Sequence, residues 1–304
     1  MSTGKPAFLV EPIDYEQGLA DLRAVRETVF VQEQNVPVEE EWDALDPQCL
    51  HVIARDADGQ PIGTGRLTPE HKLGRMAVLP GWRGRGVGDA LLAALVDVAR
   101  QRGWRELALN AQVSAISFYA RHGFVPYDAR FHEAGIEHQA MRRKLEGATA
   151  IETRDAAVAI TTALAGRARR NLWIYSRDLD PGLLDAPEVM AALRRLAVAG
   201  HGGEIRILLQ DADAAQRAHA PLIALAQRLP SVLMFREVGD PVDRDYASAF
   251  IANDAGGYYF RSLGHRFDGE ADLGGGGRTR QLIEAFRPVW ERARLVAEYR
   301  ALGI

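Results

Sequence analysis

The residues with the clearest chemical potential are Arg83-Gly84-Arg85-Gly86-Val87-Gly88, a run of three glycines interleaved with two arginines. Glycine has no side chain, so a ligand can approach the backbone N–H groups closely. If the run opens a helix, those N–H groups lack partners within the chain and favour an anion. The run therefore predicts a phosphate site, with a pyrophosphate as the best match. A tight turn carrying two solvated arginines is the alternative interpretation.

The sequence around this run predicts the elements that would hold it in place. Lys72–Val78 has the pattern of a strand, and Val87–Gln101 has that of an amphipathic helix. A Walker loop needs a Lys before Ser or Thr, which is missing from this run. A Rossmann loop needs a different glycine spacing and an acidic residue about 20 residues later. The next predicted strand, Glu106–Asn110, ends without a carboxylate, so both fingerprints are excluded.

Four stretches together resemble one family. The Arg-x-x-Gly-x-Gly spacing from Arg83 to Gly88 resembles the acetyl-CoA loop of the GNAT N-acetyltransferases. Met76-Ala77-Val78 resembles the strand that pairs with the pantetheine arm in that family. Ala115-x-x-Phe118-Tyr119-x-x-x-Gly123-Phe124 resembles its second CoA-contact helix, and residues 23–34 resemble the opening helix of its ElaA-like subgroup. The resemblance implies an α/β protein with the GNAT fold, a mixed, splayed central sheet flanked by helices.

The same resemblance implies that acetyl-CoA is the co-substrate and that no metal takes part. The residues that it assigns to acetyl-CoA are Met76, Ala77, Val78, Arg83, Gly84, Arg85, Gly86, Val87, Gly88, Asp89, Gln112 and Phe118. Gln112 departs from the family pattern, which usually has an Asn at this position. A glutamine makes the same amide hydrogen bonds with one extra methylene.

The reaction implied by the resemblance is direct attack of a primary amine on the acetyl carbonyl. Tyr119 would be the general acid that protonates the leaving thiolate. A core aromatic packed beside Phe118 is the alternative interpretation of Tyr119. A primary amine has a pKa of about 10.4 and is almost fully protonated at neutral pH, so a base is needed as well.

The sequence leaves the identity of that base open. Many GNAT enzymes carry a Glu on the strand before the glycine loop, but this strand, Lys72–Val78, holds no carboxylate. Glu33, His51, Glu133 and His138 remain as candidates. Glu33 and His138 rank first because their segments resemble the ElaA-like subgroup. A surface carboxylate and a locally bonded strand histidine are the respective alternatives.

Composition narrows the class of protein. The 304 residues are 47% hydrophobic and 26% charged, typical of a soluble chain long enough for two domains. The net charge of −4 argues against nucleic acid as the main partner. No apolar run is long enough for a membrane, and Met1–Pro6 does not resemble a signal peptide. The single cysteine, Cys49, suits a reducing cytoplasm. It would share a strand face with His51, as an acetyl-cysteine mechanism requires, but a buried thiol is the favoured interpretation.

We expect two domains, 1–147 and 148–304, of which the second is also α/β. The succession of elements in the second domain faintly resembles half of a phospholipase D-like domain. That family's His-x-Lys motif is missing, so no catalytic residue is carried over. A helix near Ala214–Arg228 and a final helix from about Arg280 to Arg300 are predicted, and Gly274–Gly277 is expected to be a flexible connector.

Acidic residues in two places have competing interpretations. Asp178 and Asp211 follow predicted strands, where α/β sheets bind ligands, but helix capping by Asp185 and by either Asp211 or Asp213 is favoured. The acidic loop of residues 39–46, around Trp42, is interpreted as a solvated surface rather than a rim for a cationic substrate.

The leading hypothesis is an acetyl-CoA-dependent N-acetyltransferase acting on a small-molecule or protein amine. A non-catalytic acyl-CoA sensor stays open because the strand carboxylate is missing. A third hypothesis gives the second domain an adaptor role that recruits a protein substrate. A homodimer is compatible with all three.

Overall fold

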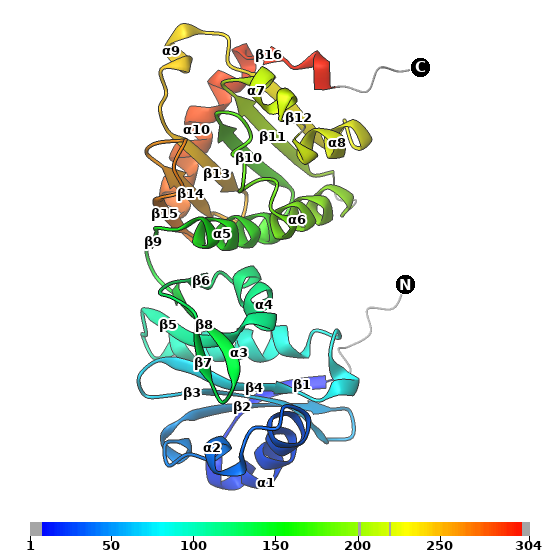
Figure 1. Ribbon diagram of the computed structural model, residues 1–304, viewed down its shortest axis with the longest axis vertical. Coiled ribbons are helices and arrows are strands. Elements are labelled where there is room, and N and C mark those ends of the chain that lie inside the picture. The colour runs from blue at the N-terminus through cyan, green and yellow to red at the C-terminus, as the bar shows by residue number, and fades with distance from the viewer. Residues whose placement is uncertain (1–7, 200–201, 219, 300–304) are drawn as a thin grey trace. The chain divides into compact units, whose positions relative to one another are not determined.

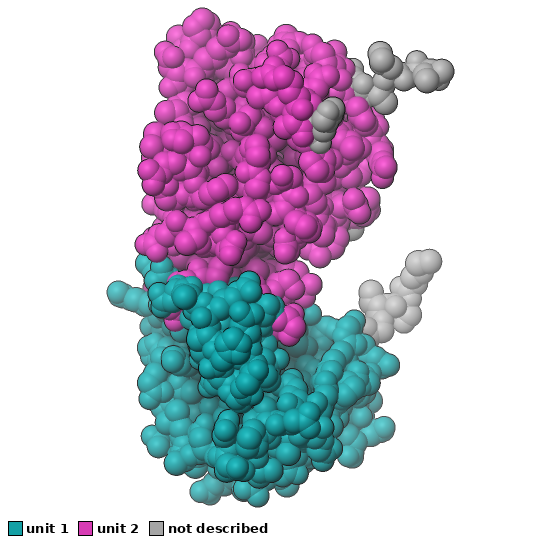
Figure 2. All heavy atoms as spheres, in the orientation of Figure 1, with its two compact units in different colours: residues 1–113, 128–145 teal, residues 114–127, 146–304 magenta. Residues whose placement is uncertain are grey.

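The structure, a computed structural model, describes residues 8–199, 202–218 and 220–299. The chain divides into two compact units, shown in teal and magenta in Figure 2. The first comprises residues 1–113 and 128–145, and the second comprises residues 114–127 and 146–304. Residues 114–127 are thus grouped with the second unit, although they precede residues 128–145 of the first in the sequence. None of the described helices is both long enough and apolar enough to cross a bilayer.

The first unit is a mixed sheet covered by helices (Figure 1). Its strands lie in the order β1-β2-β3-β4-β5-β8, with β7 paired to β8; of these pairs β4 and β5 run parallel and the others antiparallel. The strands are β1 (Phe8–Ile13), β2 (Leu50–Asp56), β3 (Pro61–Leu67), β4 (Lys72–Val78), β5 (Glu106–Gln112), β7 (Phe131–Glu133) and β8 (Ile136–Lys144). The helices are α1 (Tyr15–Arg26), α2 (Val38–Glu41) and α3 (Val87–Gln101).

Helix α1 begins where the sequence predicted, because the Asp14 carboxylate accepts hydrogen bonds from the N–H groups of Glu16 and Gln17. It does not run on as an α-helix, however. Residues Glu27–Glu33 form a π-helix, called the π segment below, in which the Gln34 N–H bonds to the Val29 carbonyl five residues earlier. Long π-helical stretches are rare and often mark functional sites.

The second unit contains a sheet in the order β16-β12-β11-β10-β13-β14-β15-β9, whose strands β10, β11 and β12 are parallel. The strands are β9 (Thr149–Ile151), β10 (Asn171–Ser176), β11 (Glu204–Leu209), β12 (Leu233–Glu237), β13 (Ala249–Asn253), β14 (Tyr258–Arg261), β15 (Gly269–Asp272) and β16 (Arg294–Leu295). The helices are α5 (Arg154–Arg167), α6 (Pro187–Val198), α7 (Ala212–Arg217), α8 (Pro221–Arg228), α9 (Pro241–Arg244) and α10 (Gly276–Arg292). Helix α4 (Ile116–Arg121) and strand β6 (Val125–Pro126) belong to this unit as well, and both contact α5.

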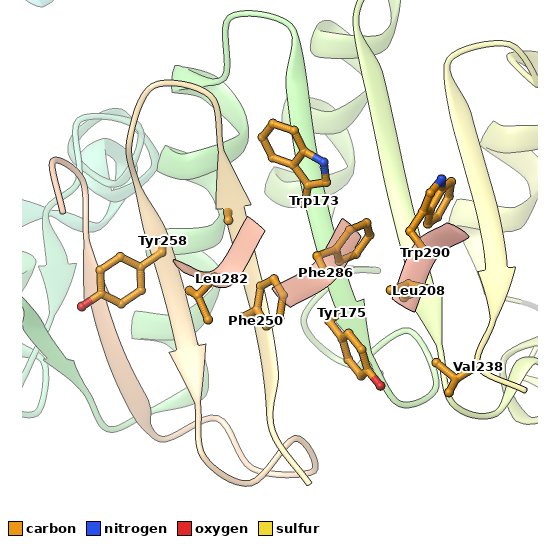
Figure 3. Packing of buried hydrophobic residues seen from close by; sticks show 10 residues of the cluster. Trp173, Tyr175, Leu208, Val238, Phe250, Tyr258, Leu282, Phe286 and Trp290 are labelled. Carbon is orange, nitrogen blue, oxygen red and sulfur yellow. The ribbon is translucent and has the colours of Figure 1, made fainter. Parts of the chain in front are cut away.

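An aromatic core holds α10 against this sheet (Figure 3). Trp173 and Tyr175 of β10 and Phe250 of β13 face Phe286 and Trp290 of the helix. The rings of Phe286 and Trp290 stack with their centroids 5.6 Å apart. The prediction that these two helix residues are core is confirmed, since Phe286 is 1% exposed and Trp290 is 4% exposed.

Several predicted elements were wrong in extent. The strand expected over Val125–Arg130 is shorter, since β6 covers only Val125–Pro126, and the hairpin that turns at Ala134 and Gly135 is formed by β7 and β8. The helix expected near Ala214–Arg228 is two helices, α7 and α8, because Pro221 starts a new one. Asp185 does not cap α6, since its carboxylate accepts the N–H of Gly182, whereas Asp211 caps α7 as predicted.

The glycine stretch Gly274–Gly277 is not a connector. Helix α10 begins at Gly276, and a Cβ atom on Gly275 would lie 2.7 Å from the Tyr258 ring, so a side chain has no room there. The helix ends at Arg292, earlier than expected, and its predicted end at Arg300 lies outside the described residues, as does Met1–Pro6.

Candidate functional site

The glycine run connects β4 to α3 in the context that the sequence predicted. Gly84 and Gly86 have φ values of 72° and 84°, a left-handed conformation that only glycine adopts readily. A Cβ atom at either position would meet nothing within 4 Å, so the backbone here faces open space. Gly86 is also the N-cap of α3, a 15-residue helix. The loop therefore presents uncovered N–H groups at the positive end of a helix dipole.

Strand β4 pairs with β5 through its first two residues. Their Cα partners are Lys72 with Ala108 and Leu73 with Leu109. Met76-Ala77-Val78 lie beyond these pairs on β4, and Gln112 is the last residue of β5. Arg75, at φ 49°, lies where the register between β3 and β4 shifts. Such an irregularity bends a strand locally, so it changes the direction of the residues of β4 that follow.

Glu33, the last residue of the π segment, and Gln34, which follows it, bond to the loop after β4 and to the end of β5. The Glu33 carboxylate accepts hydrogen bonds from Nη1 and Nη2 of Arg83 at 2.7 and 2.6 Å. The Gln34 Oε1 accepts one from Nε2 of Gln112 at 2.9 Å. The Arg83 hydrogen bonds lower the pKa of Glu33 and raise that of Arg83. Glu33, ranked first as a base from the sequence, thus has both oxygens engaged by a cation.

His138 lies on β8 directly opposite Gln112 of β5, so the two side chains share a face of the sheet. Its Nδ1 lies 2.9 Å from the carbonyl of Ile136, which can only accept, so Nδ1 carries the proton. The Nε2 of a neutral imidazole is then left with a free lone pair. The Phe131 ring stacks on His138, with the ring centroids 5.9 Å apart. Glu133, in the same hairpin, lies 3.5 Å from the Asn110 amide.

Tyr119 and Phe118 lie on α4, which belongs to the second unit. Tyr119 is 8% exposed and packs edge-on against Phe118 and Phe124, with ring centroids 5.0 and 5.9 Å away. Burial raises the pKa of the Tyr119 phenol to about 12. The hydroxyl therefore keeps its proton throughout the neutral range, as a general acid must.

Cys49 and His51 do not form a nucleophile and base. The Cys49 thiol is buried, as predicted, and donates to the Leu45 carbonyl at 3.2 Å. Burial raises its pKa to about 11, so the thiolate is scarce at neutral pH. His51 has its Nε2 bonded to the Asp46 carbonyl at 2.8 Å, and burial lowers its pKa.

The acidic loop is a solvated surface only in part. Glu39 and Glu40 are exposed, as the favoured interpretation expected, whereas Glu41 and Asp46 are 1% and 0% exposed, and both bind the buried guanidinium of Arg26. Arg66 contacts Asp46 at 2.5 Å, and Arg75 contacts Glu41 at 3.3 Å. Burial favours protonation of Asp46, but the hydrogen bonds and charges of Arg26 and Arg66 outweigh it and lower the pKa. The loop is therefore bound to the first unit by arginines from three elements.

We expect Arg26→Met to destabilise the first unit strongly. The change leaves two buried carboxylates without their main partner, which costs about 3–5 kcal/mol. Arg23→Met is the matched control, because Arg23 lies on the same helix and also stacks on Trp42 but is exposed. Its loss should cost less than about 1 kcal/mol. Urea unfolding followed by circular dichroism measures both, and equal losses would contradict a special role for the buried network.

The structure brings together several of the predicted site residues. The run 83–89 forms one loop and helix start, Glu33 meets Arg83, and His138 lies beside Gln112. Sequence reasoning missed Gln34 and Arg75. Gln34 follows the candidate Glu33 directly, so the Glu-Gln pair was the available signal. The described residues contain no group of three or more acidic, His or Cys side chains arranged to hold a metal ion.

Comparison with known proteins divides the chain in two. Residues 18–145 match the model of the acetyltransferase (GNAT) domain, and residues 153–302 match a domain of unknown function, DUF7931. The uncharacterized N-acetyltransferase YjcF of Bacillus subtilis is 41% identical over 132 residues, which are 42% of this chain and 94% of that protein.

Solved structures match the same region. An acyl-CoA N-acyltransferase from Pseudomonas aeruginosa is 30% identical, with a TM-score of 0.41, and the match covers 45% of this chain and 99% of that one. Escherichia coli ElaA is 24% identical, with a TM-score of 0.41, over 45% of this chain and 99% of its own.

Proposed function

Since this chain belongs to the GNAT acetyltransferase family, as its sequence predicted, we propose that it transfers an acetyl group from acetyl-CoA to a primary amine. The observation that carries the proposal is the glycine loop between β4 and α3. Its left-handed glycines leave the backbone uncovered, and α3 adds the partial positive charge of a helix N-terminus. These features fit a pyrophosphate held by residues 83–89, with the pantetheine arm along Met76, Ala77 and Val78.

The proposed chemistry is direct attack of the amine on the thioester carbonyl. The amine nitrogen bonds to the acetyl carbon, the carbon–sulfur bond breaks, and the sulfur leaves with its electron pair. Tyr119 is proposed to donate its phenolic proton to that sulfur, in keeping with its raised pKa. Gln112 and Phe118 are proposed as further contacts of the co-substrate.

His138 is our proposal for the base. Its Nε2 lone pair is available, whereas the carboxylate of Glu33 is engaged by Arg83 and has a lowered pKa. His138 would take a proton from the amine directly or through water, so that the nitrogen can attack. The position of His138 beside Gln112, at the end of β5, supports this assignment.

We expect His138→Gln to lower kcat about 100-fold at neutral pH. The loss should shrink as the pH rises toward 10, because the amine then loses its proton to the solvent without help. His132→Gln, on the neighbouring strand β7, is the control and should leave kcat unchanged. A His138 variant with an unaltered pH profile would exclude His138 as the base.

The experiment that tests the function is release of free CoA thiol from acetyl-CoA with a panel of small amines and lysine peptides. Turnover on any amine supports the proposal. Tight acetyl-CoA binding without turnover on any amine would favour the second candidate, a non-catalytic acyl-CoA sensor. The missing carboxylate on β4 is the observation that keeps this candidate open.

We propose a domain boundary between residues 147 and 148, which lies between the two family matches. We also propose that the second domain recruits a protein substrate or regulates the first domain. Helix α5 contacts α4, the helix that carries Tyr119, so a change in α5 could alter the position of the proposed general acid. We further propose a cytoplasmic protein, with a small-molecule or protein amine as acceptor and the option of a homodimer.

A further inference from the structure

The side-chain bonds of Glu33 and Gln34 make the end of the π segment a bridge between the loop that follows β4 and the end of β5. Residues 27–34 are called the strap below. Arg83 lies in the loop after β4, and Gln112 is the last residue of β5. The strap is thus held to Arg83 by a charged pair and to Gln112 by an amide pair.

The strap itself is fixed on β4 by apolar packing. Val25 and Val29 bury their side chains against Ala77, and Phe30 and Leu79 pack on the same cluster. The bonds of Glu33 are different, because the side chains of Glu33 and Arg83 are 39% and 45% exposed. Exposed ion pairs are weak and are screened by salt. The Glu33–Arg83 pair can therefore exchange while the strap stays in place.

Arg83 is the first of the two arginines in the glycine run, and the Glu33 carboxylate is the anion that it binds in this structure. The guanidinium gives Nε–H to the Val78 carbonyl at 3.0 Å and one N–H from each terminal nitrogen to Glu33. A carboxylate in this fork holds the positions that a phosphate would take, since both anions accept paired N–H groups from arginine.

We propose that Glu33 is a built-in competitor of the CoA pyrophosphate for Arg83, and so a positioning residue that limits CoA affinity and favours product release. This inference rests on the proposed function, because it assumes that CoA phosphates bind the glycine loop. It gives Glu33 a role that does not require it to take a proton from the amine.

Glu33→Gln tests the inference by titration calorimetry of the full chain with free CoA. The amide keeps the size of the side chain but removes its charge, so CoA should bind about fivefold more tightly at low salt. This gain in CoA affinity should fade at about 0.5 M salt, because salt at that concentration screens exposed charges. Pantetheine, which lacks the pyrophosphate, should bind both proteins equally. Glu27→Gln, on the same strap and also exposed, is the control and should give no comparable gain.

A double-mutant cycle with Arg83→Gln makes the test specific. Glu33→Gln should give no gain when Arg83 is absent, because the two residues act through one bond. Unchanged or weaker CoA binding by Glu33→Gln alone would overturn the inference, and so would an equal gain in the Arg83→Gln background. Failure of the folded wild-type protein to bind CoA would instead overturn the proposed function, so the two failures are distinguishable.

Discussion

Gly86→Glu is expected to abolish measurable binding of acetyl-CoA. The left-handed backbone at φ 84° costs a non-glycine residue about 1–2 kcal/mol. The new carboxylate would also lie where the pyrophosphate is proposed to bind, at the N-cap of α3. Together these effects should weaken binding by about 100-fold or more. Calorimetry with acetyl-CoA measures the loss.

Two variants separate the causes of that loss. Gly81→Glu adds the same charge in the turn before the loop, at an exposed position with open space and without a left-handed backbone. It should bind acetyl-CoA nearly as well as the wild type. Gly86→Ala isolates the backbone strain and should lie between the two. Wild-type affinity in a folded Gly86→Glu protein would exclude the loop as the pyrophosphate site.

Tyr119→Phe is expected to lower kcat by about 10²–10⁴-fold and to leave the affinity for acetyl-CoA nearly unchanged. The substitution removes one proton donor and keeps the ring that packs between Phe118 and Phe124. The pKa of about 12 adds a second expectation. Because the phenol stays protonated below that value, kcat of the wild type should show no loss from this group up to about pH 11.

Single-turnover kinetics with the best amine measure the effect on the chemical step. Tyr246→Phe, a partly exposed tyrosine of the second unit, is the control and should have wild-type kcat. If the Tyr119 variant turned over at the wild-type rate while chemistry limited the reaction, Tyr119 would be a packing residue only.

Features that depend on residues close together in the sequence were predictable. The glycine loop is one continuous run, and the spacing of its glycines predicts both the left-handed turns and the start of the helix. Asp14 and Asp211 were predicted as caps because the capping group and the N–H groups that it binds lie within three residues.

Features that depend on distant partners were not predictable. Glu33 and Arg83 are 50 residues apart, and Gln34 and Gln112 are 78 apart. Glu41 and Asp46 of the acidic loop were misinterpreted for the same reason, since a charge run looks solvated until Arg26, Arg66 and Arg75 are brought to it. Gly275 belongs to this class too, because the nearest group to a side chain at this N-cap would be the Tyr258 ring, which comes from a strand distant in the sequence.

The π segment makes the contacts of the strap depend on its helix type as well as on its residue types. A π-helix closes its hydrogen bonds over five residues rather than four, so each residue turns less around the axis than the roughly 100° of an α-helix. If the same residues closed into α-helical turns, Glu33 and Gln34 would rotate around the axis relative to Val29, away from Arg83 and Gln112. A relative in which substitutions elsewhere in the segment restored α-helical turns would therefore lose this contact without losing the glutamate.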